Sequence, residues 1–201
     1  MKIAAIKKII MDAKRCIIVT DGEGNQWIGD GKRFYAVDED FRFERETVLT
    51  VLDVDKEKRG KVNIFKENSG DPRFSIYPKE PNGDFLKGEV LKPRMAIMYG
   101  GELVMVFMTE RREVFALEHA YLKPVDMGRD YMLLRREVFG EEMRPVIAVQ
   151  TDMFVNALLT PLPQKVARSI IAEAGMIADG EAKPYGKDDD DELIKGTEKA
   201  E

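Results

Sequence analysis

Residues 17–32, IIVTDGEGNQWIGDGK, contain the glycines, carboxylates and amides that phosphate-binding and cation-binding loops use. A Walker-type phosphate loop needs a glycine five positions before its Gly-Lys pair and a hydroxyl after it, but Gln26 and Arg33 stand there. A dinucleotide fingerprint fails because Trp27 occupies the position of its third glycine. A calcium-binding EF-hand fails at Gln26 and again at Lys32, where it needs glycine and glutamate. The stretch therefore predicts a hairpin turn between two strands.

Carboxylates are the second candidate for chemistry, because they hold Mg²⁺ in nucleases and other phosphotransfer enzymes. Four of them lie near one another in sequence, at the ends of adjacent predicted strands: Asp21, Asp30, Asp38 and Asp40. Acidic residues also favour strand ends and turns for structural reasons, and no spacing here selects a ligand set. We therefore assign no metal ligand, cofactor or catalytic residue, and keep a carboxylate-metal nuclease or phosphatase as the alternative function.

The chain contains a single cysteine, Cys16, and a single histidine, His119. A structural zinc site needs about four ligands of these two types, so it is excluded. A catalytic Cys–His pair is arithmetically possible, but Cys16 begins an apolar stretch, where a small buried residue is the ordinary interpretation. His119 is expected to be a surface or capping residue. A lone cysteine forms no internal disulfide, which suits a reducing compartment.

Residues 2–14 have the three-and-four spacing of an amphipathic helix. Its apolar stripe is formed by Ile3, Ile6, Ile10 and Ala13. Its other face carries the basic residues Lys7, Lys8, Lys14 and, nearby, Arg15. Such a face is either an ordinary solvated surface or a surface that binds phosphates. These four cations are our candidate nucleic-acid-binding residues.

The chain of 201 residues has a net charge of −5, with 44% hydrophobic and 34% charged residues. This composition supports a sizeable core in one large domain or two small ones. The negative charge argues against a protein that coats nucleic acid with its whole surface, but it allows one basic face on an acidic body. We find neither a signal peptide nor an apolar run that would span a bilayer, and so expect a cytoplasmic protein without a membrane partner.

Short β-branched and aromatic stretches separated by Gly, Asp and Asn predict strands in the first half of the chain. These strands are expected at 16–20, 26–29, 33–37 and 61–65. Residues 44–59 favour a helix, although their valines also suit a strand. Residues 66–93, with prolines and several glycines, predict a long irregular segment.

The second half predicts an antiparallel meander followed by a hairpin. Its strands are expected at 94–100, 103–109, 113–118, 131–139 and 144–151, with a returning strand in 153–163. Between the meander and the hairpin, Pro124 ends any short helical turn. Residues 162–178 predict a second helix that begins near Pro163. The expected fold is therefore α+β, dominated by antiparallel sheet, with an N-terminal and a C-terminal helix.

These elements divide the chain into four expected segments. They are the N-terminal helix plus strands at 1–66, the irregular segment at 67–93, the antiparallel strands plus C-terminal helix at 94–179, and an acidic tail at 180–201. The tail is charged and poor in apolar residues, so we expect it to be disordered. Its run of aspartates, Asp188 to Asp191, is either an ordinary solvated segment or an imitation of a phosphate backbone.

Two resemblances add to this interpretation. The stretches QWIGDGKRFYAVD, VLTVLDVDKEKRGK, AYLKPV and PVIAVQTDMFVNALLTPLP resemble uncharacterised proteins of bacteriophages and prophages from Firmicutes, across most of residues 1–163. RPVIAVQTDMFVNALLTPL also resembles the last strands of sliding DNA clamps, which are acidic rings lined by basic helices. The clamp resemblance implies two clamp-like halves and phosphate contacts by the lysines of the first helix. The chain departs from the clamps in its short length, in its small number of helices and in the helix after the closing strand.

We therefore expect a phage or prophage accessory protein that acts by binding rather than catalysis. Its partner is a protein, a second copy of the chain, or DNA held by the basic helix face. A clamp-like role in DNA replication is the most concrete version. Besides the carboxylate-metal enzyme, a decoy whose acidic tail imitates DNA stays open as a third hypothesis.

Overall fold

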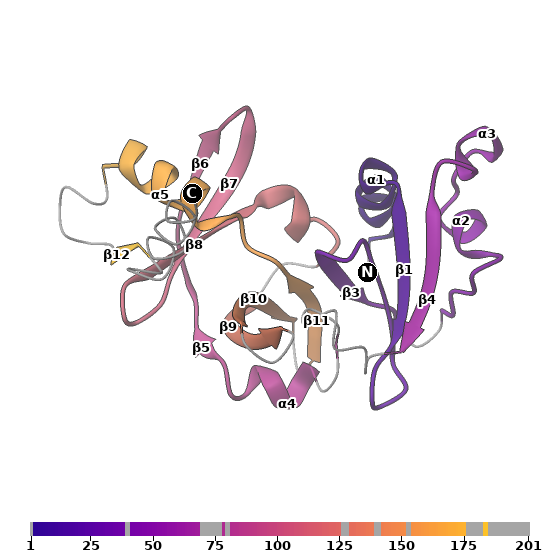
Figure 1. The fold of residues 1–201 in the computed structure, drawn as a ribbon, viewed down its shortest axis with the longest axis horizontal. Coiled ribbons are helices and arrows are strands. Elements are labelled where there is room, and N and C mark those ends of the chain that lie inside the picture. The colour runs from indigo at the N-terminus through magenta and orange to yellow at the C-terminus, as the bar shows by residue number, and fades with distance from the viewer. Residues whose placement is uncertain are drawn as a thin grey trace, which may run out of the picture. The chain divides into compact units, whose positions relative to one another are not determined.

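The computed structural model describes residues 2–38, 41–68, 78, 81–125, 129–138, 142–151, 154–175 and 183–184. The chain divides into two compact units, whose helices and strands are labelled in Figure 1. Unit 1 comprises Met1–Leu91 and His119–Pro161, and unit 2 comprises Lys92–Glu118 and Leu162–Glu201. Each unit has its own sheet and its own hydrophobic cluster.

Unit 1 is built on an eight-stranded sheet with the strand order β4-β1-β2-β3-β11-β10-β9-β5. Its strands are β1 Arg15–Thr20, β2 Gln26–Gly29, β3 Arg33–Ala36, β4 Asn63–Asn68, β5 Glu89–Val90, β9 Arg129–Val138, β10 Glu142–Thr151 and β11 Phe154–Leu159. Its helices are α1 Ile3–Ala13, α2 Val48–Val51, α3 Lys56–Arg59, α4 Pro81–Phe85 and the 3-10 helix η1 His119–Leu122. The pairing of β1 with β4 is parallel, and the other pairings in this sheet are antiparallel.

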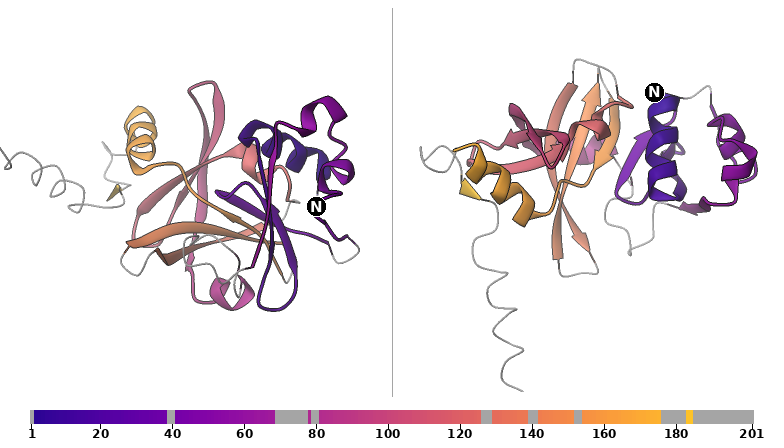
Figure 2. Two further views of the ribbon diagram at one scale, coloured as in Figure 1. Left: turned by 45° about the vertical axis from the view of Figure 1, so that its right-hand side comes forward. Right: turned by 90° about the horizontal axis from the view of Figure 1, so that it is seen from above.

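Both faces of the N-terminal strands are covered, which explains why β1 is apolar at successive positions. Ile17 and Val19 belong to a core cluster that also contains Trp27 and Phe34. Ile18 points to the opposite face, because side chains alternate along a strand, and it is fully buried as well. Helix α1 packs against β1 and β2 and buries three isoleucines (Figures 1 and 2). The apolar side of α1 is therefore buried against the outward-facing apolar residues of the strands that it covers.

Unit 2 contains a four-stranded sheet with the order β12-β8-β7-β6. Its elements are β6 Lys92–Tyr99, β7 Glu102–Met108, β8 Glu113–Glu118, α5 Gln164–Glu173 and β12 Lys183–Pro184. Strands β6, β7 and β8 form an antiparallel meander, whereas β12 pairs with β8 in parallel. Helix α5 contacts β8, and its buried side chains join those of β7 and β8 in one cluster: Val104, Val106, Met108, Val114, Ala116, Ala167, Ile170 and Ile171.

The predicted fold class is confirmed. The described residues form an α+β structure of mainly antiparallel sheet, with α1 near the N terminus and α5 in the C-terminal part of the chain. The meander, the hairpin β9–β10 and the returning strand β11 all form. Strands β1 and β2 pair antiparallel around residues 21–25. The glycine-rich stretch therefore contains the hairpin turn that was predicted once the phosphate-loop, dinucleotide and EF-hand motifs had been rejected.

The single helix expected at 44–59 is wrong. The structure has two four-residue helices there, α2 and α3. Asp53 has a φ of 53°, in the left-handed region that a continuous helix does not contain. The amide of Val54 then donates to the carbonyl oxygen of Leu49 at 2.8 Å, a bond that closes the end of a helix. Leu52 and Val54 are both buried, so packing of these side chains overrides the local helix propensity.

Helix α5 is shorter than the predicted 162–178, since it runs from Gln164 to Glu173. Gly175 has a φ of 70°, the left-handed conformation that commonly follows the last turn of a helix. Residues 176–178 lie outside the described residues. Of the predicted tail at 180–201, Lys183–Pro184 form β12, and the predicted disorder concerns residues that the structure does not describe.

The two units group the chain differently from the segments expected at 1–66, 67–93 and 94–179. Strand β11 pairs antiparallel with β3, with Ala157 opposite Tyr35, and thereby joins β9–β11 to the N-terminal strands in one sheet. The expected irregular segment contains α4, β5 and the start of β6, although residues 69–77 and 79–80 lie outside the description. Pairing between strands far apart in sequence, which local patterns do not encode, sets this organisation.

Candidate anion-binding site

The four cations predicted on the first helix are used in different ways. Lys7 is half-buried, and its ammonium group donates to the backbone oxygen of Asp53 and pairs with the Asp53 carboxylate at 3.3 Å. It therefore holds the turn between α2 and α3. Lys8 is exposed on α1. Lys14 is also exposed, and it ends the helix in the left-handed conformation, with a φ of 52°.

Arg15 lies beyond the helix, at the start of β1, and is exposed. Its terminal nitrogen lies 3.7 Å from the place that a Cβ of Gly31 would occupy, so it reaches toward the turn between β2 and β3. Lys7, by contrast, reaches toward Asp53. The cations were grouped because they lie opposite the apolar stripe of a helix predicted at 2–14, but α1 ends at Ala13. The structure therefore brings Lys7 and Arg15 to different neighbours and not to one shared ligand site.

Asp21, a candidate metal ligand, is a structural acceptor in the hairpin β1–β2. Its side chain is buried, and its carboxylate accepts hydrogen bonds from the amides of Glu23 and Asn25 at 2.9 and 2.8 Å. It also accepts from Asn25 Nδ2 at 3.2 Å and from Trp27 Nε1 at 3.0 Å. These donors satisfy both carboxylate oxygens, so the residue closes the turn and fixes the tryptophan.

Asp30 has the same role in the next turn, between β2 and β3. Its buried carboxylate accepts from the amides of Lys32 and Arg33, both at 2.9 Å, and from the Arg33 guanidinium at 3.0 and 2.5 Å. The guanidinium also lies 3.9 Å from the centre of the Tyr121 ring. The hydroxyl of Tyr35 donates to the Tyr121 backbone oxygen at 2.9 Å, and burial raises the pKa of Tyr35. The Asp30 carboxylate and the Arg33 guanidinium are therefore paired with each other and surrounded by groups of the protein.

The four aspartates do not converge as a metal site in the described residues. Asp21 follows β1 and Asp30 follows β2, and because these strands are antiparallel the two carboxylates lie at opposite ends of the pair. Asp38 is exposed, and Asp40 lies outside the described residues. In the described ranges no group of three or more His, Cys, Asp or Glu side chains could hold a metal ion. The carboxylate-metal hypothesis gains no support from this arrangement.

Cys16 and His119 have ordinary structural surroundings. Cys16 is fully buried in β1, as expected, and burial raises the pKa of its thiol to about 12. The thiol is therefore protonated at neutral pH, whereas a nucleophilic cysteine needs its thiolate. His119 is half-buried at the start of η1.

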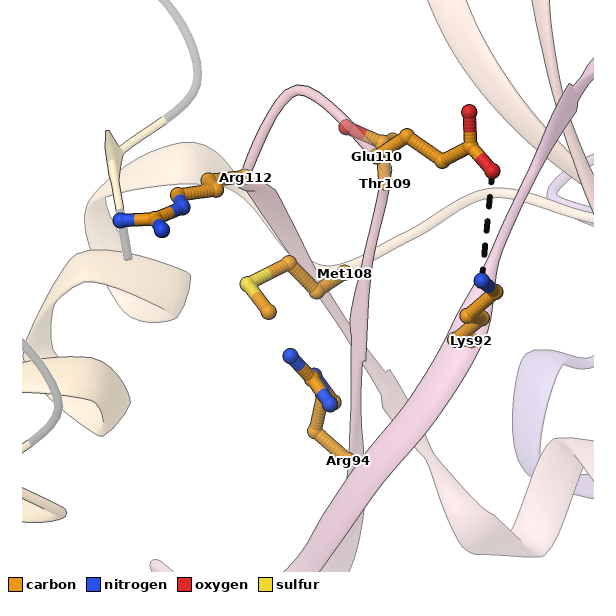
Figure 3. Close-up of a pocket in the computed structure, with 6 residues that line it drawn as sticks. All are labelled: Lys92, Arg94, Met108, Thr109, Glu110 and Arg112. Atoms are coloured by element: carbon orange, nitrogen blue, oxygen red, sulfur yellow. Dashed lines mark ion pairs between the residues drawn. The ribbon is translucent and has the colours of Figure 1, made fainter. Parts of the chain in front are cut away.

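A basic hollow of about 300 Å³ opens on the sheet of unit 2 (Figure 3). It is lined by Lys92, Arg94, Met108, Thr109, Glu110 and Arg112, which together are called the basic cradle below. Three cations share this hollow with one carboxylate, in a chain whose net charge is −5. The cradle therefore concentrates positive charge on a protein that is acidic as a whole.

Strand pairing and a β-bulge bring two of the cations to the hollow. Lys92 in β6 lies opposite Met108 in β7. The register shifts between Pro93 and Met95, which leaves Arg94 as the extra residue of a bulge. Bulges re-aim side chains and occur often beside functional sites. Figure 3 shows the Arg94 and Arg112 side chains on either side of Met108.

The third cation, Arg112, is presented by the tight turn between β7 and β8. The amide of Thr109 donates to the Glu113 carbonyl at 2.9 Å, and the amide of Arg112 donates to the Thr109 carbonyl at 3.0 Å. The buried Thr109 hydroxyl accepts from the Glu113 amide at 3.2 Å. Arg112 has a φ of 66°, a conformation that residues other than glycine rarely adopt. The turn thus keeps an exposed arginine where glycine would be less strained.

Glu110, the carboxylate of the cradle, forms only a long ion pair with Lys92. Lys92 Nζ lies 3.9 Å from Glu110 Oε1, and the two side chains are 64% and 73% exposed. An ion pair of this kind contributes roughly 0–1 kcal/mol, because water screens it and both side chains lose freedom. Lys92 can therefore exchange Glu110 for an anionic ligand at little cost in free energy.

These three cations are functional candidates that the sequence predictions missed. One signal was present, since Lys92 and Arg94 are two residues apart, a spacing typical of side chains on one face of a strand. The strand was expected to begin at residue 94, which left Lys92 outside it. The approach of Arg112 depends on the register of β6, β7 and β8 and on a bulge, neither of which the sequence reveals.

Comparison with known protein families, with curated proteins and with solved structures finds no match to this chain. The resemblances to phage proteins and to sliding clamps therefore stay predictions, as does association with a protein partner or a second copy. In the part of the chain that the structure describes, every helix is too short or too polar to cross a membrane.

Proposed function

We propose that this protein binds the phosphate backbone of nucleic acid through the basic cradle, without selecting a base sequence. The observation that carries the proposal is the convergence of Lys92, Arg94 and Arg112 on one hollow of about 300 Å³. The proposal keeps the class of function expected from the sequence, which is binding by a basic surface on an acidic body. It moves that surface from α1 to unit 2.

The chemistry of the cradle suits phosphate groups. Two of its cations are arginines, whose planar guanidinium presents a fork of N–H donors that matches phosphate oxygens. Lys92 supplies a compact positive charge beside them. All three side chains are exposed, so a long polyanion reaches them without unfolding the turn. Each phosphate that a cation neutralises releases counterions from the nucleic acid, and this release drives binding that is independent of sequence.

The same six residues argue against base reading and against catalysis at this place. The described lining contains no aromatic ring on which a base would stack. It also contains no histidine or cysteine, and the Thr109 hydroxyl is buried and bonded to the Glu113 amide. A nucleophile needs an adjacent base and access to substrate. Binding to the backbone is therefore the function that this geometry supports best.

The proposal is tested by fluorescence anisotropy with a short labelled oligonucleotide at low salt. The cradle variant carries Lys92→Glu, Arg94→Glu and Arg112→Glu. The matched control carries Lys8→Glu, Lys14→Glu and Arg15→Glu, which changes the net charge of the chain equally. We expect the cradle variant to bind at least about tenfold more weakly than the unaltered protein, and the control to lose about threefold at most.

Two results would contradict the proposal. Equal losses in both variants would mean that only the net charge matters. A loss confined to the control would return the site to the α1 region, where the sequence first placed it. Circular dichroism of both variants establishes that each is folded, and a second oligonucleotide of different base composition should bind with the same affinity.

A further inference from the structure

We infer that the acidic run at Asp188–Asp191 occupies the basic cradle of the same chain and competes there with nucleic acid. The competition rests on the proposed function, whereas the contact between the run and the cradle is testable without any nucleic acid. The occupant is thus a named segment of this chain, which β12 tethers beside the cradle.

The tether is the pairing of β12 with β8. Lys183 lies opposite Glu113, and Pro184 lies opposite Val114. Glu113 directly follows Arg112 of the cradle, and paired strands lie about 4.8 Å apart. Figure 3 shows this short strand, in pale yellow, close to the Arg112 side chain. The chain therefore passes the rim of the cradle just before its acidic run begins.

The connection between β12 and the acidic run is long enough for the run to reach the cradle. Because β12 runs parallel to β8, the chain leaves Pro184 in the direction away from Arg112 and must turn back by about two residues of strand, roughly 7 Å. The four residue steps from Pro184 to Asp188 span at most roughly 13–14 Å. Gly186 lies within this connection and tolerates the backbone conformations of a tight turn. The connection is therefore long enough for the first aspartate of the run to reach Arg112.

The charges are complementary. The cradle offers three cations and one loosely engaged carboxylate, Glu110, and the run offers four consecutive carboxylates. Arginine binds carboxylates through the same paired N–H donors that it offers to phosphates. A segment tethered by so short a linker has an effective concentration in the millimolar range, so even weak contacts are populated. Nucleic acid must then displace the run before it binds, and salt weakens both interactions.

The first arm of the test measures competition in the full chain. The tail variant carries Asp188→Asn, Asp189→Asn, Asp190→Asn and Asp191→Asn. The control loses the same amount of negative charge at exposed acids of unit 1, through Asp12→Asn, Glu23→Gln, Glu46→Gln and Glu57→Gln. We expect the tail variant to bind an oligonucleotide about tenfold more tightly at low salt, and the control about twofold at most. Equal gains in the two variants would overturn the inference.

The second arm measures the contact itself by NMR. A nitroxide label is attached at Ile194→Cys in the full chain; Cys16 is fully buried and its thiol stays protonated, so it does not compete for the reagent. We expect the label to broaden the amide signals of Arg94 and Arg112, and the signals to recover when the four aspartates are asparagines. Absent broadening, or broadening that the asparagines leave unchanged, would overturn the inference.

The two arms separate this inference from the proposed function. Broadening that depends on the aspartates, in a protein that binds no oligonucleotide, would refute the function and support the contact. Oligonucleotide binding through the cradle, with no broadening and equal gains in the tail variant and its control, would refute the contact and support the function.

Discussion

The turns around β2 in unit 1 and the basic cradle in unit 2 both gather charged side chains at strand ends, yet they use charge in opposite ways. Asp21 and Asp30 are buried, and each accepts several hydrogen bonds within its own turn. Lys92 and Arg94 are exposed, and Lys92 has only a loose carboxylate partner at 3.9 Å. Residue type alone therefore does not distinguish a buried structural charge from an exposed charge that we propose to bind a ligand. Burial and the number of hydrogen-bond partners distinguish the two kinds of charge.

Gly29→Ala should destabilise unit 1 by about 3 kcal/mol or more, because the new Cβ would lie 1.8 Å from the backbone oxygen of Arg33. The turn that Asp30 closes would have to move. Urea unfolding measures the loss. Gly60→Ala is the control, since a Cβ there meets nothing within 4 Å and its φ is −64°. Equal stability of the two variants would contradict the tight turn.

Asp21→Ala should cost about 2–3 kcal/mol of unfolding free energy, since it leaves the Trp27 indole N–H and two turn amides without their acceptor. The exposed Asp12→Ala on α1 is the matched control and should change stability by no more than about 0.5 kcal/mol. A near-neutral Asp21→Ala that instead abolished a magnesium-dependent activity would revive the carboxylate-metal enzyme.

Buried groups should make the protein sensitive to alkali. The pKa of the Cys16 thiol is raised from an ordinary value of 9.0 to about 12, so above pH 9 the unfolded chain loses this proton while the folded chain keeps it. Stability then falls with rising pH between 9 and 12, by up to about 1.4 kcal/mol per pH unit from this group. Cys16→Val should flatten that part of the curve in chemical unfolding at stepped pH. An unchanged slope would contradict the buried thiol.

Arg112 should show a conflict between stability and binding. Its φ of 66° is strained for arginine and unstrained for glycine, so Arg112→Gly should be about 1 kcal/mol more stable than Arg112→Ala in thermal unfolding. Both variants lack the guanidinium and should bind oligonucleotide equally weakly. If the two were equally stable, the left-handed turn would be in doubt. If both kept full affinity, Arg112 would have no part in the cradle.

Local sequence patterns predicted elements better than sites. The hairpin around residues 21–25 followed from its glycines and flanking β-branched residues, and α1 followed from its isoleucine spacing. The partner of Asp21 at Trp27 and the break at Asp53 depend on tertiary packing, which no local pattern reports. The same holds for the basic residues. The sequence showed Lys7 and Lys8 opposite the apolar stripe of the first helix, whereas the cradle depends on the register of three strands.

If cations of the cradle contact phosphates, the salt dependence of oligonucleotide binding must report those contacts. The measurement is the slope of log affinity against log salt concentration for the unaltered protein, for Arg94→Ala and for Lys8→Ala. We expect Arg94→Ala to reduce the steepness of the slope by about one, because one phosphate contact is lost, and Lys8→Ala to leave it unchanged. An unchanged slope for Arg94→Ala, or an equal reduction for both, would contradict the cradle as the binding site.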